Sequence, residues 1–391
     1  MFTLVRGAVV VLALLSLAAC APKATPTPAA QSAVAASGAP VSALLSELIA
    51  KARDEGELDT ATITEVGSGV PRLIDAFNAR FGLNLTINVA LGDQAGKYSQ
   101  LLTSLQAGLP PIYDTLTGSE EDNLRMVEEG YAQKVDNWEM LLTEINPLVA
   151  SKQVKLEDVS PALFSGYAFL WTTRDKGLLY NPKVMPEAEL PKTYPDMANP
   201  KYRGKFVLAP WTDQFEMGVL VYKDKEEWVR TVDQIGKNSA DVMNFSPALD
   251  RILLGEFAFQ PSNMYYYWQV KDRDPQAPIG LRYFDDYIPY TKVMYVVPKR
   301  AAHPAAATLW ALWITTPEAQ AIWQPVSFLP NLVFGQSELD TQNRENLHKS
   351  QGRIVSWYDS EETLAQLKWY ATTEGKQYRA RLTAALTQRQ H

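Results

Sequence analysis

Cysteine is almost absent from this sequence: Cys20 is the single cysteine in 391 residues. A disulfide framework and a metal site built from several cysteines are therefore excluded. Histidine is scarce as well, because the chain has only His303, His348 and His391, which lie far apart in sequence. This spacing disfavours a His-rich zinc site.

An excess of basic residues is also lacking. The chain has 37 Lys and Arg against 44 Asp and Glu, which gives a formal net charge of −7. This balance offers no electrostatic reason to expect nucleic acid as a partner. A hydrophobic fraction of 46% and a charged fraction of 21% are typical of a packed globular protein. The length suits two or three domains or one large bilobed body.

The N-terminus has the pattern of an export signal. Residues 1–6 carry one positive charge, residues 7–19 are apolar, and Leu17-Ala18-Ala19 precedes Cys20. This ending resembles the lipobox of bacterial lipoproteins, which implies cleavage before Cys20 and attachment of lipid to that residue. The alternative is a plain signal peptide with an incidental cysteine. No later stretch approaches 18 uninterrupted apolar residues, so no other transmembrane helix is expected.

Residues 21–40 are rich in Ala, Pro, Ser and Thr and contain almost no large apolar side chain. Such a segment cannot bury a core, so we expect an extended linker that holds the folded body away from the membrane.

The folded body begins near Ser42 with alternating helix and strand patterns. The apolar spacing and the Gly and Pro positions predict helices at 44–56, 71–82 and 98–107, and strands at 58–66, 83–91 and 112–116. The alternation of strands and helices predicts an α/β lobe with a largely parallel sheet.

Two loops of this lobe are candidates for ligand contact, because ligands of open α/β sheets bind where strands lead into helices. One loop contains Ser68 and the other contains Thr117 and Ser119. Their hydroxyls and backbone N–H groups suit a polar or anionic group. The alternative for Ser68 and Ser119 is a simple helix N-cap.

A second α/β region is predicted after Pro161. Residues 169–180 are apolar at both ends with a turn-like middle, residues 206–209 form a short apolar strand, and residues 226–235 have helical spacing. Residues 284–298 could return the chain to the first lobe, with 293–297 as the strand.

Aromatic residues concentrate in this second region. Ten of the residues from Phe257 to Tyr290 are aromatic, whereas the whole chain contains 10%. Rigid aromatic rings with polar tips suit a binding site, but alternate members of the run could equally face a core. The candidate ligand contacts here are Tyr265, Tyr266, Tyr267, Tyr290, Trp211, Thr212 and Asp213.

Acidic residues near these aromatics, including Asp285 and Asp286, suit a cationic or amine-bearing solute, and a sugar stacked on Trp211 is also compatible. An exposed turn is the alternative for the Asp pair. The chain lacks the nucleophile elbow, the His-Glu-x-x-His zinc motif and the phosphate loop of common enzyme families. An envelope-anchored hydrolase, such as a glycosidase using Glu120 and Glu121, and a structural envelope lipoprotein are the rival classes.

Several segments, taken in order, resemble bacterial extracellular solute-binding proteins of ABC importers, in the branch with iron(III), thiamine and polyamine binders. The matching segments, in chain order, are Ala52-Arg53-Asp54-Glu55-Gly56-Glu57-Leu58, Leu73-Ile74-Asp75-Ala76-Phe77, Asp114 with Glu129-Gly130-Tyr131-Ala132, Gly177-Leu178-Leu179-Tyr180-Asn181, Asn199-Pro200-Lys201-Tyr202-Arg203-Gly204-Lys205, and His303-Pro304-Ala305-Ala306-Ala307 with Thr316-Pro317-Glu318-Ala319-Gln320. The lysine-rich fifth segment is the most specific. The resemblance covers about residues 50 to 325.

The resemblance implies an α/β, two-lobed fold of the periplasmic-binding-protein type II class, with a hinge and one ligand held between the lobes. The expected organisation is a signal peptide at 1–19, a lipidated Cys20 and linker at 20–41, lobe 1 at 42–160 and 290–330, lobe 2 at 161–289, and a C-terminal helical region at 331–391 packing on the lobes.

The implied role is a non-enzymatic, lipid-anchored and exported monomer that delivers a small organic solute to an ABC permease, without a cofactor. Iron-binding members use adjacent tyrosines as ligands, so Tyr265 and Tyr266 make ferric iron the alternative. The first loop, Gly67-Ser68-Gly69, lacks the His or acidic residue that often completes such a site.

Overall fold

The computed structural model describes residues 41–92, 94–211 and 213–387. The chain divides into two units, Met1–Val41 and Ser42–His391, and the second unit contains a continuous hydrophobic core of its own. The predictions for the signal peptide, Cys20, the linker and Thr212 concern positions that lie outside the described residues. Across the described ranges, no helix combines the length and apolarity needed to cross a membrane.

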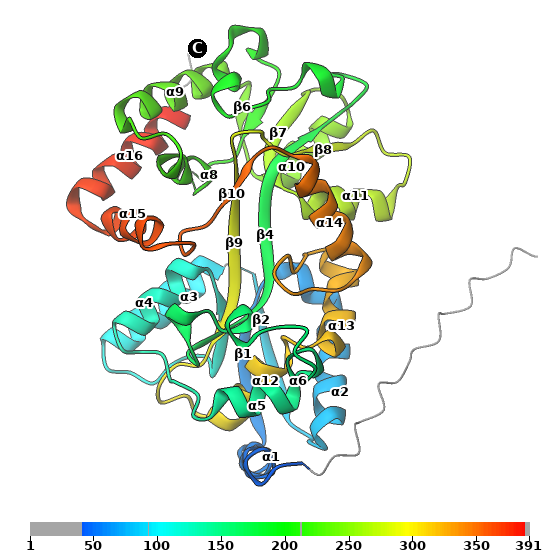
Figure 1. Ribbon diagram of the computed structural model, residues 1–391, viewed down its shortest axis with the longest axis vertical. Helices are drawn as coiled ribbons and strands as arrows, with labels where there is room; N and C mark the ends of the chain where they lie inside the picture. The colour runs from blue at the N-terminus through cyan, green and yellow to red at the C-terminus, as the bar shows by residue number, and fades with distance from the viewer. Residues whose placement is uncertain (1–40, 93, 212, 388–391) are drawn as a thin grey trace, which may run out of the picture. The chain divides into compact units, whose positions relative to one another are not determined.

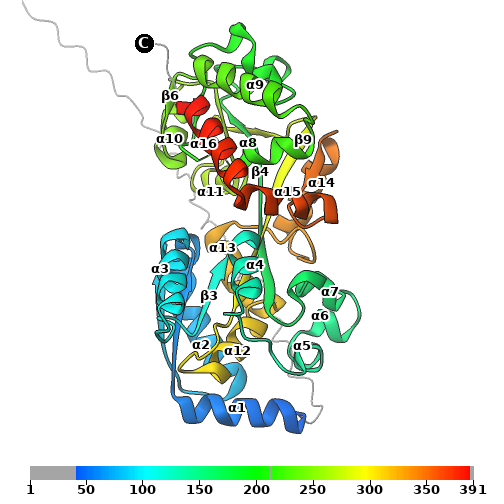
Figure 2. The same cartoon turned by 90° about the vertical axis from the view of Figure 1, so that its left-hand side faces the viewer.

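The first lobe is an α/β layer built around three short parallel strands (Figures 1 and 2). Its strands are β1 (Glu57–Thr62), β2 (Thr86–Leu91) and β3 (Thr115–Gly118). Its helices are α1 (Ala43–Glu55), α2 (Val70–Phe81), α3 (Gln94–Gln106), α4 (Glu120–Glu128), α5 (Trp138–Ile145), α6 (Pro147–Ala150), α7 (Leu156–Val159), α12 (Pro304–Trp313) and α13 (Pro317–Ser327), with the 3₁₀ helices η1 (Thr64–Gly69) and η2 (Ala162–Phe164).

Local sequence signals explain where these helices begin and end. The Ser42 hydroxyl accepts a hydrogen bond from the Leu45 N–H at the start of α1, and Gly56 ends the helix with a φ of 72°, which favours glycine. Pro71 lies in the first turn of α2. Helices α2 and α12 pack against each other through buried aromatic rings: the ring of Phe77 lies with its centroid 5.1 Å from that of Trp310 and 5.4 Å from that of Trp313.

Two long strands connect the lobes. Strand β4 (Ala168–Tyr180) and strand β9 (Tyr287–Val296) run antiparallel, with Ala168 opposite Val296 and Asp175 opposite Tyr290. Both strands extend from one lobe into the other (Figure 1). The sheet order is β2-β1-β3-β9-β4-β7, so the parallel strands of lobe 1 join the crossing pair through β3 and β9.

The second lobe contains shorter strands and most of the aromatic cluster. Its strands are β5 (Val207–Leu208), β6 (Asp241–Val242), β7 (Phe259–Asn263) and β8 (Gly280–Arg282). Its helices are α8 (Asp213–Glu216), α9 (Lys225–Asn238), α10 (Phe245–Leu253) and α11 (Tyr265–Arg273), with the 3₁₀ helices η3 (Glu187–Glu189), η4 (Pro195–Ala198), η5 (Pro200–Tyr202) and η6 (Met217–Leu220).

The last sixty residues return to the crossing and to lobe 2. They form α14 (Glu338–Lys349), β10 (Arg353–Val355), α15 (Glu361–Ala371) and α16 (Thr373–Thr387). Strand β10 pairs in parallel with β9, and α16 packs along α9. The buried Asp340 ties α14 to α13, because its carboxylate accepts hydrogen bonds from the side chains of Gln320 and Gln324.

Two sequence-based interpretations need correction. Residues 169–180 contain no turn, since β4 continues through the polar residues 172–176, of which 172–175 pair with β9 and Lys176 pairs with β7. The tyrosine run 265–267 is not a strand but the first turn of α11. The order of helices and parallel strands predicted for residues 44–116 is confirmed.

Candidate ligand-binding site

Two cations project from one face of β4 where the strand passes between the lobes. Arg174 and Lys176 are two residues apart, and alternation along a strand places them on the same face. The Arg174 side chain is 25% exposed and that of Lys176 only 7%. Because buried lysines need a partner, it is significant that Lys176 forms an ion pair with Asp213 at the start of α8. The Asp213 side chain remains 51% exposed.

Side chains from both lobes meet beside Arg174. The Tyr265 hydroxyl, on α11 of lobe 2, donates a hydrogen bond of 2.7 Å to Glu65 Oε1, which lies on η1 of lobe 1. The same carboxylate oxygen is 4.0 Å from Arg174 Nη2. Burial, and then the charge of Glu65, raises the pKa of Tyr265 well above its usual range. The phenol is therefore a proton donor at neutral pH.

Aromatic rings continue from this junction along α11 and α10. The rings of Tyr265 and Tyr266 have centroids 4.3 Å apart, and Tyr266 lies 6.0 Å from Phe245. Trp211 meets Phe245 edge-on at 5.3 Å and is 42% exposed. These rings give the site a rigid apolar wall that is open at the Trp211 end.

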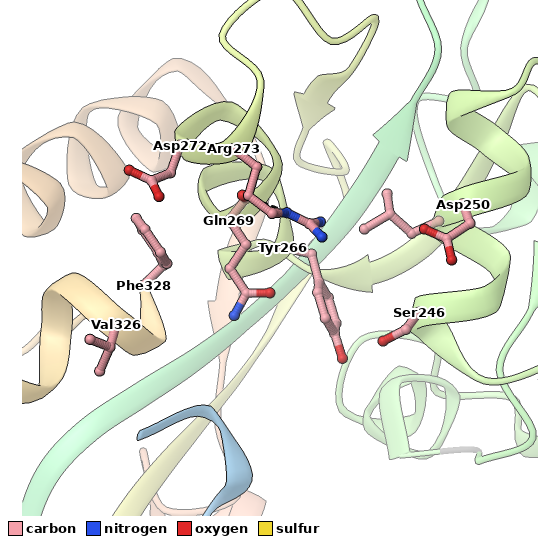
Figure 3. Close-up of a pocket in the computed structure, with 9 residues that line it drawn as sticks. Ser246, Asp250, Tyr266, Gln269, Asp272, Arg273, Val326 and Phe328 are labelled. Carbon is pink, nitrogen blue, oxygen red and sulfur yellow. Dashed lines mark hydrogen bonds between the residues drawn. The ribbon is translucent and has the colours of Figure 1, made fainter. Parts of the chain in front are cut away.

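A cavity of about 360 Å³ adjoins this wall between α10, α11 and the end of α13 (Figure 3). Its lining includes Ser246, Asp250, Tyr266, Arg273, Val326 and Phe328. At its edge, Gln269 Nε2 on α11 donates a hydrogen bond of 3.2 Å to the Ser327 carbonyl, so the lobes also touch here. A cavity of this volume is at the small end of the range for small-molecule sites.

Two buried polar atoms at the site have no hydrogen-bond partner within the described ranges: Arg174 Nε and Asn263 Oδ1. Asn263 is directly opposite Lys176 in the β4–β7 pairing and is 9% exposed. Buried polar groups are nearly always paired in folded proteins. Both atoms are therefore positions at which a bound ligand could form a hydrogen bond.

The structure brings together only some of the residues predicted from sequence. Tyr265 and Tyr266 meet at the interlobe junction, Asp213 pairs with Lys176 there, and Trp211 lies at the open end of the aromatic wall. Tyr267 packs its ring edge-on against Trp268 at 4.9 Å, and burial raises its pKa.

The hydroxyl groups predicted from the two loops of lobe 1 have different surroundings. Ser68 lies exposed on η1. Ser119 caps α4 in a reciprocal arrangement with Asp122, as in the N-cap alternative. The Thr117 hydroxyl is buried and has no partner among the described residues.

Tyr290 belongs to the opposite face of the crossing. It pairs directly with Asp175, whereas Arg174 pairs with Thr291, so Tyr290 and Arg174 point to different sides of the ribbon. On that side, Lys292 Nζ is 6.0 Å from the Tyr290 ring and 3.6 Å from Glu120 Oε1.

The Glu120 carboxylate is the centre of a polar cluster on this opposite face. It is 1% exposed, accepts a 3.0 Å hydrogen bond from the Ser356 hydroxyl, and accepts a second from the Lys292 N–H at 3.3 Å. Burial raises the pKa of Glu120 to about 7, and the charge of Lys292 opposes that rise. Asp175 is similar: it accepts a hydrogen bond from the Tyr283 hydroxyl, and burial raises its pKa to about 6.

Glu65, Arg174, Lys176 and Asn263 are the site residues that sequence reasoning missed. For Arg174 and Lys176, the sequence feature that could have revealed them is the charged run Arg174-Asp175-Lys176 inside an otherwise apolar segment. In a turn, such charged side chains would be exposed to solvent. In a buried strand, the first and third of them lie on the same face and need partners.

The architecture and this interlobe junction define a two-lobed periplasmic binding protein. A sequence profile described as "Bacterial extracellular solute-binding protein" matches residues 72–331. The chain belongs to this family of exported proteins, which bind solutes for ABC transporters. The resemblance inferred from the sequence motifs is thereby confirmed, and so is the fold class.

Several solved structures are similar in fold. Iron-bound HitA from Pseudomonas aeruginosa aligns with a TM-score of 0.62 and 19% identity, over 81% of this chain and 99% of that one. A substrate-binding protein of an ABC transporter from Bradyrhizobium japonicum USDA 110 aligns at 0.64 and 15% identity, over 85% and 99%. AgtB from Agrobacterium tumefaciens R10, in complex with agropinic acid, aligns at 0.58 and 14%, over 85% and 99%. No curated protein sequence matches the chain.

Proposed function

We propose that this solute-binding protein captures a small organic molecule between its lobes and delivers it to the membrane permease without catalysing a reaction. The observation that carries the proposal is the convergence of Glu65 from lobe 1, Arg174 from the crossing strand and Tyr265 from lobe 2. A molecule held there would touch both lobes, and its binding energy would favour the closed arrangement.

The aromatic wall and the half-exposed Asp213 support an organic solute, and the cationic or sugar-like molecules expected from the sequence still fit these features. Arg174 and Lys176 add a second requirement, because a purely cationic solute would meet two positive charges on β4. The diversity of ligands named for similar folds, iron and agropinic acid, agrees with a site whose specificity is set by local side chains.

We also propose that lipid on Cys20 anchors the protein to the membrane, that residues 20–41 form the tether, and that the mature protein is a monomer. The proposed lobes are residues 42–160 with 290–330 and residues 161–289, with 331–391 packing on them. Metabolic labelling with an alkyne fatty acid tests the anchor: the wild type should be labelled and membrane-bound. The Cys20→Ser variant should be unlabelled and released, and labelling that persists in this variant would refute the assignment.

Ferric iron is a second candidate because an acidic residue does reach the tyrosines. Glu65 accepts the hydrogen bond from Tyr265, so two phenols and one carboxylate lie close together. These oxygen donors suit Fe³⁺.

The test uses a soluble protein beginning at Ser42, where the compact unit starts. Native mass spectrometry of freshly purified protein should show a bound organic molecule of defined mass, and ligand-free protein should gain thermal stability with it. Tyr265→Phe should weaken this binding, whereas Tyr131→Phe in lobe 1 should not. An absorption band between tyrosinate and iron that disappears with a chelator would replace the organic solute by iron. Absence of any co-purified molecule and of any stabilisation by a broad solute panel would overturn solute capture.

A further inference from the structure

We propose that the solute carries a carboxylate, and that Arg174 is the residue that binds it, assisted by Lys176. This inference rests on the proposed function and names the chemical class of its ligand. It comes from the β4 face of the site, where Arg174 is incompletely paired and Lys176 is buried against Asp213.

Arg174 is partly buried and has no hydrogen bond at the Nε edge of its guanidinium group. Its Nε atom is buried and has no partner in the described residues, and the nearest acid, Glu65, is 4.0 Å from Nη2. That distance is too long for a hydrogen bond. The Nε–H and a neighbouring Nη–H form a planar fork that matches the two oxygens of a carboxylate. Arg174 therefore has an unused carboxylate-binding edge at the point where the lobes meet.

Lys176 places a second cation on the same face. Its side chain is only 7% exposed, and the charge is balanced by Asp213, which is half in solvent. Because Asp213 comes from α8 of lobe 2, the pair also fixes α8 against the crossing strand. A solute carboxylate entering beside Arg174 would lie on a surface that already holds a second cation two residues along the strand.

The remaining acceptors indicate what else the solute carries. Asn263 Oδ1 is buried without a partner opposite Lys176, and the Asp213 carboxylate is half-exposed nearby. Both are hydrogen-bond acceptors, so they need a donor such as an amine or a hydroxyl. The site thus has an anion-binding edge and a donor-seeking side, which fits an amino or hydroxy acid.

The body of the solute has a defined place as well. Tyr266 borders both the junction and the cavity of about 360 Å³, which leads away between α10 and α13. Its volume limits the solute to a small molecule. The rings of Tyr265 and Tyr266 would contact an apolar or planar part of it.

The first arm of the test identifies the chemistry of the natural ligand. Native mass spectrometry with fragmentation of the co-purified molecule should show loss of carbon dioxide or of formic acid, as expected for an organic acid. Ligand-free protein should then bind 4-hydroxybenzoate, L-tyrosine or L-glutamate in isothermal calorimetry at least tenfold more tightly than the analogue of the same compound whose carboxylate is replaced by an amide. Inorganic phosphate and spermidine serve as the comparison anion and cation.

The second arm tests Arg174 itself. Arg174→Gln should lose at least tenfold in affinity for the bound acid, and Arg174→Lys should lose less, because it keeps the charge without the fork. Glu65→Gln should bind the acid more tightly, since it removes the negative charge next to Arg174. A role of Arg174 in folding alone would not produce this opposite effect. Arg230→Gln, on an arginine whose side chain is 64% exposed on α9, is the matched control and should bind as the wild type does.

The outcomes separate the two proposals. A neutral or cationic ligand whose affinity is unchanged by Arg174→Gln would overturn the carboxylate inference and leave solute capture standing. Tight binding of inorganic phosphate in place of every organic acid would overturn it too. If no molecule co-purifies and none of the probes binds, the proposed function itself fails.

Discussion

The β4–β9 crossing has two faces, and they differ in how completely their charged side chains are paired. On one face, Arg174 and Asn263 keep buried polar atoms without partners, and the partner of Lys176 is half-exposed. On the other, Glu120 is 1% exposed and bonded to Ser356 and Lys292, and Asp175 is bonded to Tyr283.

This difference indicates that buried charged groups have two different roles in the molecule. Groups that stay unpaired in the folded chain carry a desolvation cost that a ligand can remove, whereas groups paired within the chain hold its parts together. The Glu120 cluster joins α4 of lobe 1, strand β9 and the segment after β10. We therefore interpret the first face as the binding face and the second as a structural junction between the lobes.

The largest expected effect is on the paired face. Lys292→Met should lower the free energy of unfolding by about 3–5 kcal/mol at pH 8, because the buried Glu120 carboxylate loses its cation. Lys176→Met on the binding face should cost about 1 kcal/mol or less, since Asp213 can regain full hydration. Urea unfolding of both variants measures the difference. Equal losses would contradict the distinction between the faces.

The next effect is a pH dependence that belongs to the paired face. A carboxyl whose pKa rises from 4.5 to about 7 on folding binds its proton more tightly when folded. Its stabilising contribution is therefore complete below pH 4.5 and is lost as pH rises through 7. Glu120→Gln should gain about 2 kcal/mol relative to the wild type between pH 5 and pH 8. Parallel stability curves for the two proteins would show that Glu120 does not titrate in this range.

A third comparison uses one tyrosine from each face. Tyr265→Phe should weaken binding of the natural solute about five- to tenfold, near 1 kcal/mol, because the solute loses a hydroxyl that can accept a hydrogen bond at the junction of the lobes. Tyr290→Phe should leave the affinity unchanged, since Tyr290 points to the opposite side. Calorimetric titration of both variants is the measurement. A loss in Tyr290→Phe alone would reverse our assignment of the faces.

The smallest effect is expected at the rim of the paired face. Lys368 on α15 and Glu128 on α4 form a 2.8 Å ion pair whose side chains are 54% and 48% exposed. Exposed pairs of this kind contribute roughly 0–1 kcal/mol and are screened by salt. Lys368→Ala should therefore unfold within about 0.5 kcal/mol of the wild type, with no difference in 0.5 M NaCl. A loss as large as that of Lys292→Met would mean that surface pairs hold the lobes.

The sequence predicted those parts of the fold that depend on local signals. Ser42 and Gly56 delimit α1, and Pro71 marks the first turn of α2, because caps and turns involve neighbouring residues. The β4 strand was misread because its polar middle is explained only by contacts from distant segments. The carbonyl of Pro330, for example, accepts hydrogen bonds from the hydroxyls of Thr172 and Thr173.

The residues of the candidate site likewise divide into those that the sequence could predict and those that depend on distant contacts. An aromatic cluster is visible in composition, so Tyr265 and Tyr266 could be proposed from the sequence alone. Glu65 could not, because it is 200 residues from Tyr265 and meets it only across the two lobes. Tyr290 was grouped with the others by density, and only the register of β4 and β9 places it on the opposite face.

The packing of α16 against α9 has a consequence for how the protein is made. The two helices approach so closely at Gly236 that a Cβ there would lie 2.2 Å from the Ala385 carbonyl oxygen. Helix α16 follows α9 by about 150 residues in the chain, so this contact can form only after α16 has left the ribosome. We expect this delay to keep lobe 2 incompletely folded, and therefore easier to translocate, until α16 has been synthesised.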